Sequence, residues 1–305
     1  MRVTDSALFR QGTRGLQDTV GKIARLQEQL ISEKKINRPS DDPVGMRRVL
    51  HLSSLQSKIN QYVRNMDRAE GFIQGADIAL QNSADLLLEA QQIALLQGQG
   101  APIVDTQSRL IAADQVDQII DQMMRMANTQ VEGEFIFSGF KTDVLPYQPD
   151  PASTTGAIAY GGDGGVIQVE IAPGVSIGRN VSGDQVFGGA AGTVDIFGVL
   201  NDLRIALRAD DPTAVSNTLV TLNSAYEQVI RTMADISGAR LVRMIDTREY
   251  TLDMGVTVAS QLSQQEDVDL VAVASGFQFQ QSLLEAIRDS TARILGQRSL
   301  LDFLR

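Results

Sequence analysis

Apolar residues recur at every seventh position along much of the first third of the chain. The longest run of this pattern covers residues 43–97, where seven successive positions spaced by seven are apolar. These positions are Leu52, Ile59, Met66, Ile73, Leu80, Leu87 and Ala94. The companion positions are mostly small or apolar, which favours close approach of a second helix. The pattern predicts one long helix with a coiled-coil seam, about 80 Å long if it is unbroken.

The start of this helix is marked by a short polar segment. Pro39 disfavours helical geometry in the residue before it, so we expect a preceding helix to end near Asn37. Asp42 can cap the next helix through its carboxylate, and Pro43 suits the first helical position. Capping explains the adjacent Asp41 and Asp42 better than an acid–base pair does.

Both ends of the chain carry an apolar stripe with helical spacing. The N-terminal stripe consists of Phe9, Leu16, Ile23 and Leu30. The C-terminal stripe includes Phe277, Leu284, Ile287, Ile294 and Leu301. We expect the chain to double back so that the two stripes meet. Polar companions such as Thr19 and Gln280 interrupt both seams, which favours additional cover from neighbouring copies. The stripes are therefore the candidate assembly interface.

The composition of the chain changes in its middle. A third helical stretch follows residues 98–102 and runs to about Val131. Residues 145–192 then contain 11 of the 26 glycines and four of the eight prolines. Short β-like segments at 157–160 and 166–171 predict a small β-rich domain with tight turns. We interpret the glycine cluster at 161–165 as a turn, because a strand pattern follows where a phosphate-binding loop would open a helix.

Helical spacing resumes near residue 195, and Asp211 followed by Pro212 repeats the cap-and-proline start. We therefore expect a mainly α fold with a β-rich insertion, in which long antiparallel coiled-coil-like helices come from both chain termini. The expected domains are a terminal helical assembly domain (1–38 with 266–305), a helical core domain (39–144 with 193–265) and a β-rich outer domain (145–192).

The residue types argue against catalysis. The chain has no cysteine and one histidine, His51, which excludes disulfides and thiolate chemistry and leaves little for a zinc site. Glu132 and Glu134 would share one face of a strand, but no partner base, metal set or nucleophile loop accompanies them. We predict no enzymatic activity, no cofactor and no catalytic or metal-binding residues.

Charge and hydropathy limit the classes of partner that the chain could bind. The net charge is −10, but residues 1–68 carry 13 Lys and Arg against 7 Asp and Glu, which leaves −16 for the rest. The basic residues lie among acids at helical spacing, so a solvated face or a face meeting an acidic neighbour is expected, and no nucleic-acid partner. No run approaches the ~18 apolar residues of a membrane span, and the start of the chain lacks the apolar stretch of a signal peptide. We expect no membrane partner and, for an exported protein, a route without a cleaved signal.

Two motifs resemble those of a known family. Residues 36–45, INRPSDDPVG, resemble the loop that joins the terminal helix to the long core helix in the flagellin superfamily. The matching residues are Asn37, Pro39, Asp41, Asp42 and Pro43. Residues 133–142, GEFIFSGFKT, resemble a motif of the hook–filament junction family within that superfamily. The matching residues are Gly133, Phe135, Phe137, Ser138 and Gly139. The opening MRVT and the apolar close SLLDFLR are similar to family members as well.

The resemblance implies a structural junction protein of the bacterial flagellum, secreted unfolded through the flagellar type III channel. The implied partners are further copies of the chain in a ring, hook-associated protein 1, flagellin and an export chaperone. The absence of cysteine fits this route, because a cross-linked chain could not thread a narrow channel. The alternatives are a flagellin filament subunit and a coiled-coil signalling protein.

Overall fold

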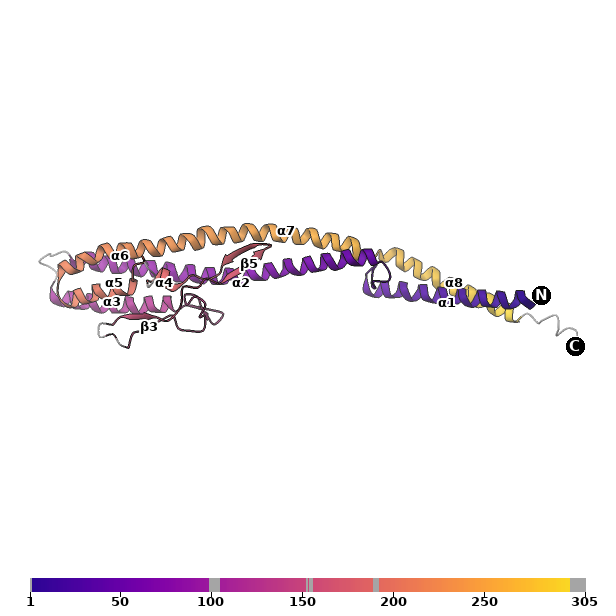
Figure 1. Cartoon of the computed structure of the whole chain (residues 1–305), viewed down its shortest axis with the longest axis horizontal. Helices are drawn as coiled ribbons and strands as arrows, with labels where there is room; N and C mark the ends of the chain where they lie inside the picture. Colours follow the sequence, from indigo (N-terminus) through magenta and orange to yellow (C-terminus); the bar gives the residue numbers. More distant parts are fainter. Residues whose placement is uncertain (1, 99–104, 152, 154–155, 189–191, 297–305) are drawn as a thin grey trace. The chain divides into compact units, whose positions relative to one another are not determined.

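The computed structural model describes residues 2–98, 105–151, 153, 156–188 and 192–296, and the side chains within residues 10–292 of these. The contacts divide the chain into two compact units, residues 1–58 with 254–305 and residues 59–253. The described chain is mainly helical, with small two-stranded sheets (Figure 1). The expected fold class is confirmed, while the finer division into three domains remains a prediction.

The first unit contains the two terminal helices. Helix α1 (Arg2–Ser32) lies beside α8 (Leu270–Gly296), and the two run antiparallel (Figure 1). The unit also includes the start of α2 (Pro43–Gly98) and the end of α7 (Leu241–Glu266). The chain therefore doubles back as its two terminal stripes predict.

The second unit has one continuous apolar core. Four helices, the second half of α2, α3 (Thr106–Ala127), α5 (Ile196–Arg208) and α6 (Pro212–Met233), supply most of it. The six heptad positions of α2 from Ile59 to Ala94 each expose 3% or less of their surface. The companion residues Ala69, Ala76 and Ala90 are also buried. The predicted seam is confirmed from Ile59 to Ala94, whereas its first position, Leu52, is half-buried. The small companion residues let the neighbouring elements approach closely.

The β-rich segment consists of short antiparallel pairs. Strands β3 (Tyr147–Pro149) and β4 (Ile158–Tyr160) form one pair, and β5 (Gln168–Ala172) and β6 (Val175–Gly178) form another. A short helix, α4 (Gly183–Val186), follows them. The segment shares the core of the helices rather than enclosing its own. Its contributions to that core are Tyr147, Ile171, Ile177, Val181, Val186 and Phe187.

Two helices end earlier than the sequence predicts. Helix α1 ends at Ser32 rather than near Asn37, because Glu33 adopts a left-handed φ of 58° that breaks the helical hydrogen bonds. Helix α3 ends at Ala127 rather than near Val131. The residues that follow it form strand β1 (Gln130–Val131), which pairs with β2 (Glu134–Phe135). Among the described residues, no helix is long and apolar enough to cross a membrane.

Candidate assembly interface

The apolar stripes of the two chain ends lie on helices that contact each other. A Cβ added at Gly12 would lie 3.5 Å from the Thr291 hydroxyl, and one at Gly276 would lie 3.8 Å from a methyl group of Leu26. Six of the predicted stripe residues are half-buried: Leu16, Ile23, Leu30, Phe277, Leu284 and Ile287. The others lie outside the described side chains: Phe9, Ile294 and Leu301.

This terminal pair leaves much apolar surface uncovered. Ile31 is 79% exposed, Val271 is 77% exposed and Phe279 is 65% exposed. Among the described side chains of α1 and α8, only Thr19 and Val273 are buried. Two helices in contact along one narrow seam cannot cover all of their apolar residues, so surface is available for a partner.

The start of α2 is capped as the sequence predicts. The Asp42 carboxylate accepts hydrogen bonds from the backbone N–H groups of Val44 at 3.0 Å and Gly45 at 2.9 Å. The bond from Gly45 contributes most to a lowered pKa of Asp42. Pro43 is the first helical residue. The capping prediction is confirmed.

The rest of the loop is fixed by local hydrogen bonds. The Asp41 carboxylate accepts from the backbone N–H of Arg38 at 3.0 Å, and the Asn37 side chain donates to the Lys34 carbonyl at 3.3 Å. The Arg38 guanidinium lies 3.0–3.2 Å from the carboxylate of Glu28 on α1. This loop therefore holds the end of α1 near the start of α2.

Backbone pairing joins the same loop to the segment after α7. The Lys35 N–H donates to the Glu266 carbonyl at 2.6 Å, and the Val268 N–H donates to the Glu33 carbonyl at 3.1 Å. Pro39 lies exposed in the turn between these contacts and α2. The turn from α1 to α2 and the turn from α7 to α8 are thus one hydrogen-bonded structure.

The segment 133–142 opens with a tight hairpin. Glu132 and Gly133 both have positive φ, at 52° and 85°, and form the turn between β1 and β2. The three predicted motif residues that follow the hairpin, Phe137, Ser138 and Gly139, are buried, and Phe135 is half-buried. The middle of the motif, residues 136–139, therefore belongs to the interior of the second unit, whereas Phe140 is exposed.

A glycine is required at position 139. Its φ is 75°, and an added Cβ would collide with the side chain and carbonyl of Asp163. The Asp163 carboxylate accepts from the N–H of Phe140 at 2.8 Å and of Gly165 at 3.0 Å, and these bonds, led by Phe140, lower its pKa. The glycine cluster at 161–165 is a turn, as predicted, and it closes around the motif.

Polar side chains of the β-rich segment complete this attachment. The Tyr160 hydroxyl lies 2.9 Å from the carbonyl oxygens of Phe137 and Asp163, so one donor is shared between them. The Asn180 amide donates to the Gly139 carbonyl at 3.2 Å. The motif joins the end of the third helix to the β-rich segment.

Five aromatic rings pack beside this attachment. They belong to Phe137, Tyr147, Tyr160, Phe187 and Phe197. The Tyr147 ring is central, with centroids 5.0 Å from Tyr160 and 5.1 Å from Phe197. Asn128 holds its backbone, accepting from the Tyr147 N–H at 2.9 Å and donating to its carbonyl at 2.8 Å. Sequence reasoning missed this cluster because its members are far apart along the chain.

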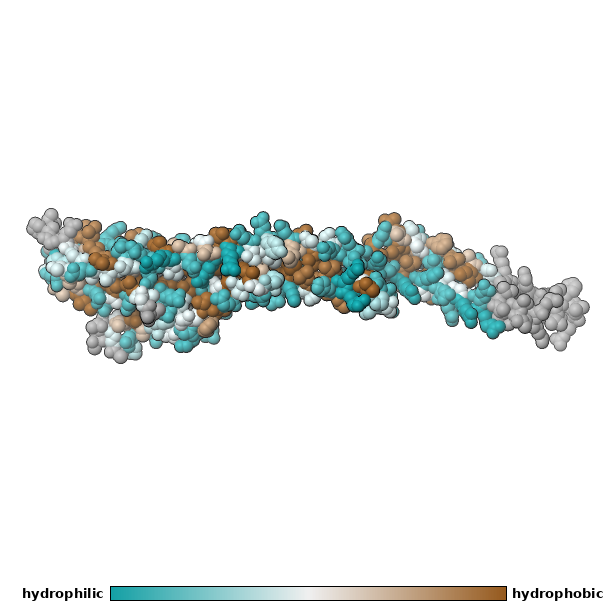
Figure 2. All heavy atoms as spheres, turned by 45° about the horizontal axis from the view of Figure 1, so that its top comes forward, coloured by the Kyte–Doolittle hydropathy of each residue, from teal (hydrophilic) through white to brown (hydrophobic). Residues whose placement is uncertain are grey.

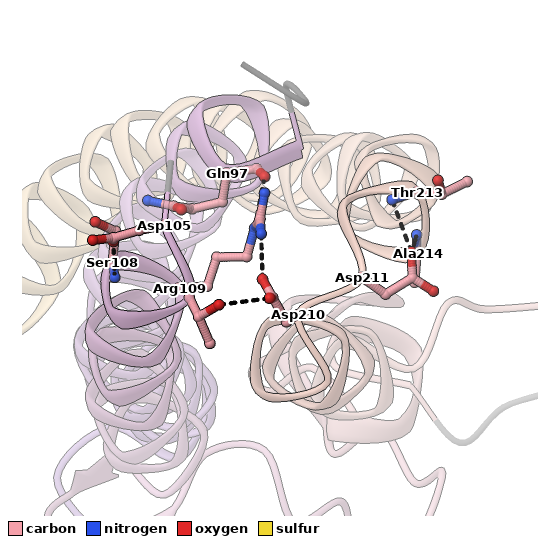
Figure 3. A network of polar contacts seen from close by, with 9 residues as sticks. Gln97, Asp105, Ser108, Arg109, Asp210, Asp211, Thr213 and Ala214 are labelled. Atoms are coloured by element: carbon pink, nitrogen blue, oxygen red, sulfur yellow. Dashed lines mark hydrogen bonds and ion pairs between the residues drawn. The ribbon is translucent and has the colours of Figure 1, made fainter. Parts of the chain in front are cut away.

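A polar network at one end of the second unit was also not anticipated (Figure 3). Arg109, nearly buried, is ion-paired with Asp210, and its Nε donates to the Gln97 carbonyl at 3.4 Å. The Thr106 hydroxyl donates a hydrogen bond to the Asp210 carboxylate at 2.7 Å. This bond is the largest cause of the lowered pKa of Asp210, and the bond from Arg109 is the second. Asp211 caps α6 through the N–H groups of the residues that follow Pro212. The network connects the end of α2, the start of α3 and the turn before α6.

The carboxylates considered for catalysis have structural positions. Glu132 lies in the hairpin turn, and Glu134 is ion-paired with Arg179, whose guanidinium lies 4.3 Å from the centre of the Phe72 ring. His51 is exposed. Within the described part of the chain, no group of three or more His, Cys, Asp or Glu is placed to hold a metal ion.

A π-helix, η1 (Ala234–Arg240), connects α6 to α7. Its Ile236 is fully buried, and Arg240 donates to the Asn180 carbonyl at 2.9 Å. Apolar residues spaced by seven after Asp211-Pro212, namely Val215, Leu222, Val229 and Ile236, are buried throughout. Because this spacing continues unbroken, nothing in the sequence distinguishes the π-helix from the helices on either side.

Comparison with known proteins adds to this geometry. Residues 10–142 match the model of the bacterial flagellin N-terminal helical region. The chain is 24% identical to flagellar hook-associated protein 3 of Escherichia coli over 308 residues, which cover 94% of each chain. It is 26% identical to the flagellar filament 33 kDa core protein of Treponema phagedenis over 260 residues, covering 84% of this chain and 80% of that protein.

A solved structure agrees with these relationships at the level of the fold. The structure of a putative flagellar hook-associated protein from Vibrio parahaemolyticus matches with a TM-score of 0.66 and 21% identity. The match covers 74% of this chain and 100% of that structure. The chain thus has the fold of that protein.

Proposed function

We propose that this chain, a homologue of flagellar hook-associated protein 3, is a structural junction protein that links the flagellar hook to the flagellin filament. The observation that carries the proposal is the correspondence over 94% of both chains with the hook-associated protein of Escherichia coli. A match over that share of the chain reaches into both terminal helices and spans the loop at 36–45 and the motif at 133–142. An enzymatic role has no support among these residues.

The terminal helix pair supports assembly with other flagellar proteins. Its seam buries few side chains, and large apolar residues on α1 and α8 are exposed. Additional copies of the chain in a ring, with hook-associated protein 1 on one side and flagellin on the other, would cover this surface. The mechanism is geometric, because the ring would match a bendable hook to a stiff filament.

The same features suit secretion to the outside of the cell in an unfolded state. A chain without cysteine forms no disulfide that would obstruct a narrow channel. Before export, the exposed apolar residues of α8 would be a binding surface for a dedicated chaperone. Export through the flagellar type III channel, without a cleaved signal, completes the proposal.

A flagellin filament subunit is the second candidate, because the chain also resembles a filament core protein of Treponema phagedenis. That match covers less of both chains than the match to the hook-associated protein does. The motif at 133–142 also favours the junction protein.

Immunogold electron microscopy of intact flagella separates the two candidates. We expect label in a single band at the distal end of the hook. Label along the whole filament would assign the chain to the filament instead. Deletion of the gene should leave hooks intact and release flagellin monomers into the medium, and normal filaments in that mutant would refute the proposal.

A further inference from the structure

A basic, partly apolar groove lies in the first unit, between the start of α2 and the end of α7. Its volume is about 560 Å³. The lining residues are Val44, Arg47, Arg48, His51, Leu52, Gln261, Gln264 and Gln265. None of them is a carboxylate. Neither arginine forms an ion pair with a described residue, while Arg48 also interacts electrostatically with the Asp42 carboxylate. The groove therefore presents two arginines beside an exposed valine.

A stripe of complementary character lies on α7 in the second unit. Val242, Ile245, Glu249 and Leu252 follow one another at steps of three, four and three, the spacing of a helix-packing seam. Val242 and Ile245 are about half exposed, at 50% and 53%. The side of α7 that faces the core is not the side of this stripe, because it carries the buried Met244. The stripe is thus a second apolar side of α7 (exposed apolar residues are brown in Figure 2).

The stripe carries Glu249 and is flanked by Asp246, and the exposed Arg243 lies three residues before Asp246. Asp246 and Glu249 lie three residues apart, which places them on one face of the helix. Neither has an ion-pair partner among the residues that the structure describes, whereas the adjacent Arg248 is already bound by Asp67 and Glu70. The stripe therefore presents two free carboxylates next to exposed aliphatic side chains.

We propose that the groove of one copy receives the α7 stripe of a second copy, an inference that rests on the proposed assembly of the protein. Helix α7 is continuous from Leu241 to Glu266 and supplies both the stripe and one wall of the groove. A continuous helix cannot fold back on itself, so the stripe of a chain cannot fill its own groove.

The charge distribution favours a second copy as the occupant. The first unit carries 15 Lys and Arg against 12 Asp and Glu, a net +3, and the second carries 12 against 25, a net −13. Opposite potentials on the two units steer unlike units of neighbouring copies together. Because the groove and the stripe are different surfaces, the contact is heterologous, and such contacts generate rings or helical arrays.

Charge reversal in the full-length chain tests the pairing. In a deletion strain, Arg48→Glu and Glu249→Arg should each lower the amount of protein retained in isolated flagella roughly fivefold or more. The double variant, which restores opposite charges between copies, should recover most of the loss. The matched controls are Arg64→Glu and Asp85→Arg, exposed α2 residues outside the groove, which should have little effect. Harmless single variants, or a double variant as poor as the worse single one, would overturn the pairing.

Disulfide trapping gives a second readout, because the natural chain has no cysteine. A chain carrying Arg47→Cys and Asp246→Cys should form cross-linked dimers and higher oligomers when isolated flagella are oxidised. A chain carrying Arg47→Cys and Asp85→Cys should not. Circular dichroism of the purified variants checks that they fold. If the unmodified protein is found at the hook–filament junction but the first pair does not cross-link, this inference fails and the proposed function stands; absence from the junction would refute the function itself.

Discussion

The core of the second unit and the terminal helix pair of the first unit differ in how much of their apolar surface a single chain covers. In the second unit, the α2 seam from Ile59 to Ala94 is almost fully covered by other elements. In the terminal pair, the described stripe residues are all half-buried, and Phe279 and Ile31 are largely exposed. The two regions have similar apolar spacing in the sequence but different packing.

The difference shows what a heptad stripe does and does not specify. A fully buried Leu or Ile side chain contributes about 1.5–3 kcal/mol, and ordering the backbone costs about 1–2 kcal/mol per residue. A seam covered from several directions offsets that cost, whereas a seam covered by one other helix offsets it only in part. We infer that the second unit folds without partners and that the terminal pair becomes fully ordered only in the assembly.

Hydrogen exchange on the purified monomer should show the largest contrast. We expect amides in residues 59–97 to be protected at least about a hundredfold more than those in 10–32 and 270–292, because the terminal pair opens locally without global unfolding. Mass spectrometry of peptides from these ranges gives the measurement. Equal protection in the three ranges would contradict the comparison, and assembled flagella should show the contrast reduced.

Matched leucine substitutions should give the next largest effect. Leu87→Ala removes a fully buried side chain from the α2 seam and should lower the free energy of unfolding by about 2–5 kcal/mol. Leu16→Ala, at a half-buried position of α1, should cost about 1 kcal/mol or less in the monomer. Urea unfolding followed by circular dichroism compares the two. Similar losses would show that α1 is as well packed as α2.

Much of the fold could be predicted because periodicity and caps are local signals. The seam from Leu52 to Ala94 and the starts of α2 and α6 at Asp42-Pro43 and Asp211-Pro212 follow from residue spacing and from side chains that bond to nearby backbone. The early end of α1 could not be predicted, since it occurs at the left-handed Glu33, whose carbonyl accepts a hydrogen bond from the N–H of Val268, more than two hundred residues away.

The burial of residues 136–139 in the middle of the motif was equally hidden in the sequence. Resemblance identified the motif, but its burial depends on Asp163, Tyr160 and Asn180, which lie 20 to 50 residues further along the chain. Spacing also says nothing about whether the cover of an apolar stripe comes from the same chain or from another. The apolar stripes therefore predicted where the helices lie in the sequence, but not how much of each stripe is buried within one chain.

Two glycine substitutions sharpen the account of the motif. Both Gly133 and Gly139 have positive φ, so an alanine at either position should cost about 1–2 kcal/mol in backbone strain. An added Cβ at Gly133 meets open space, whereas at Gly139 it collides with Asp163, which should add about 1–3 kcal/mol. The difference in the free energy of unfolding between Gly133→Ala and Gly139→Ala, measured in urea, gives the cost of the steric clash alone. Equal losses would mean that Asp163 moves aside and does not fix the motif.

The smallest expected effect concerns two tyrosines in the second unit. It tests whether the buried polar groups in the core of that unit have hydrogen-bond partners. The Tyr147 hydroxyl is buried without a hydrogen-bond partner among the described residues, and burial raises the pKa of the phenol. Tyr147→Phe removes an unpaired polar group while keeping the ring, so stability should be unchanged or rise by about 1 kcal/mol. Tyr160→Phe removes a donor shared by the carbonyls of Phe137 and Asp163, and should cost about 1–2 kcal/mol. These carbonyls keep other donors, Gly183 N–H and the Ser182 hydroxyl, which limits the loss. A clear destabilisation by Tyr147→Phe in urea unfolding would show that this hydroxyl has a partner, such as an ordered water, inside the aromatic cluster.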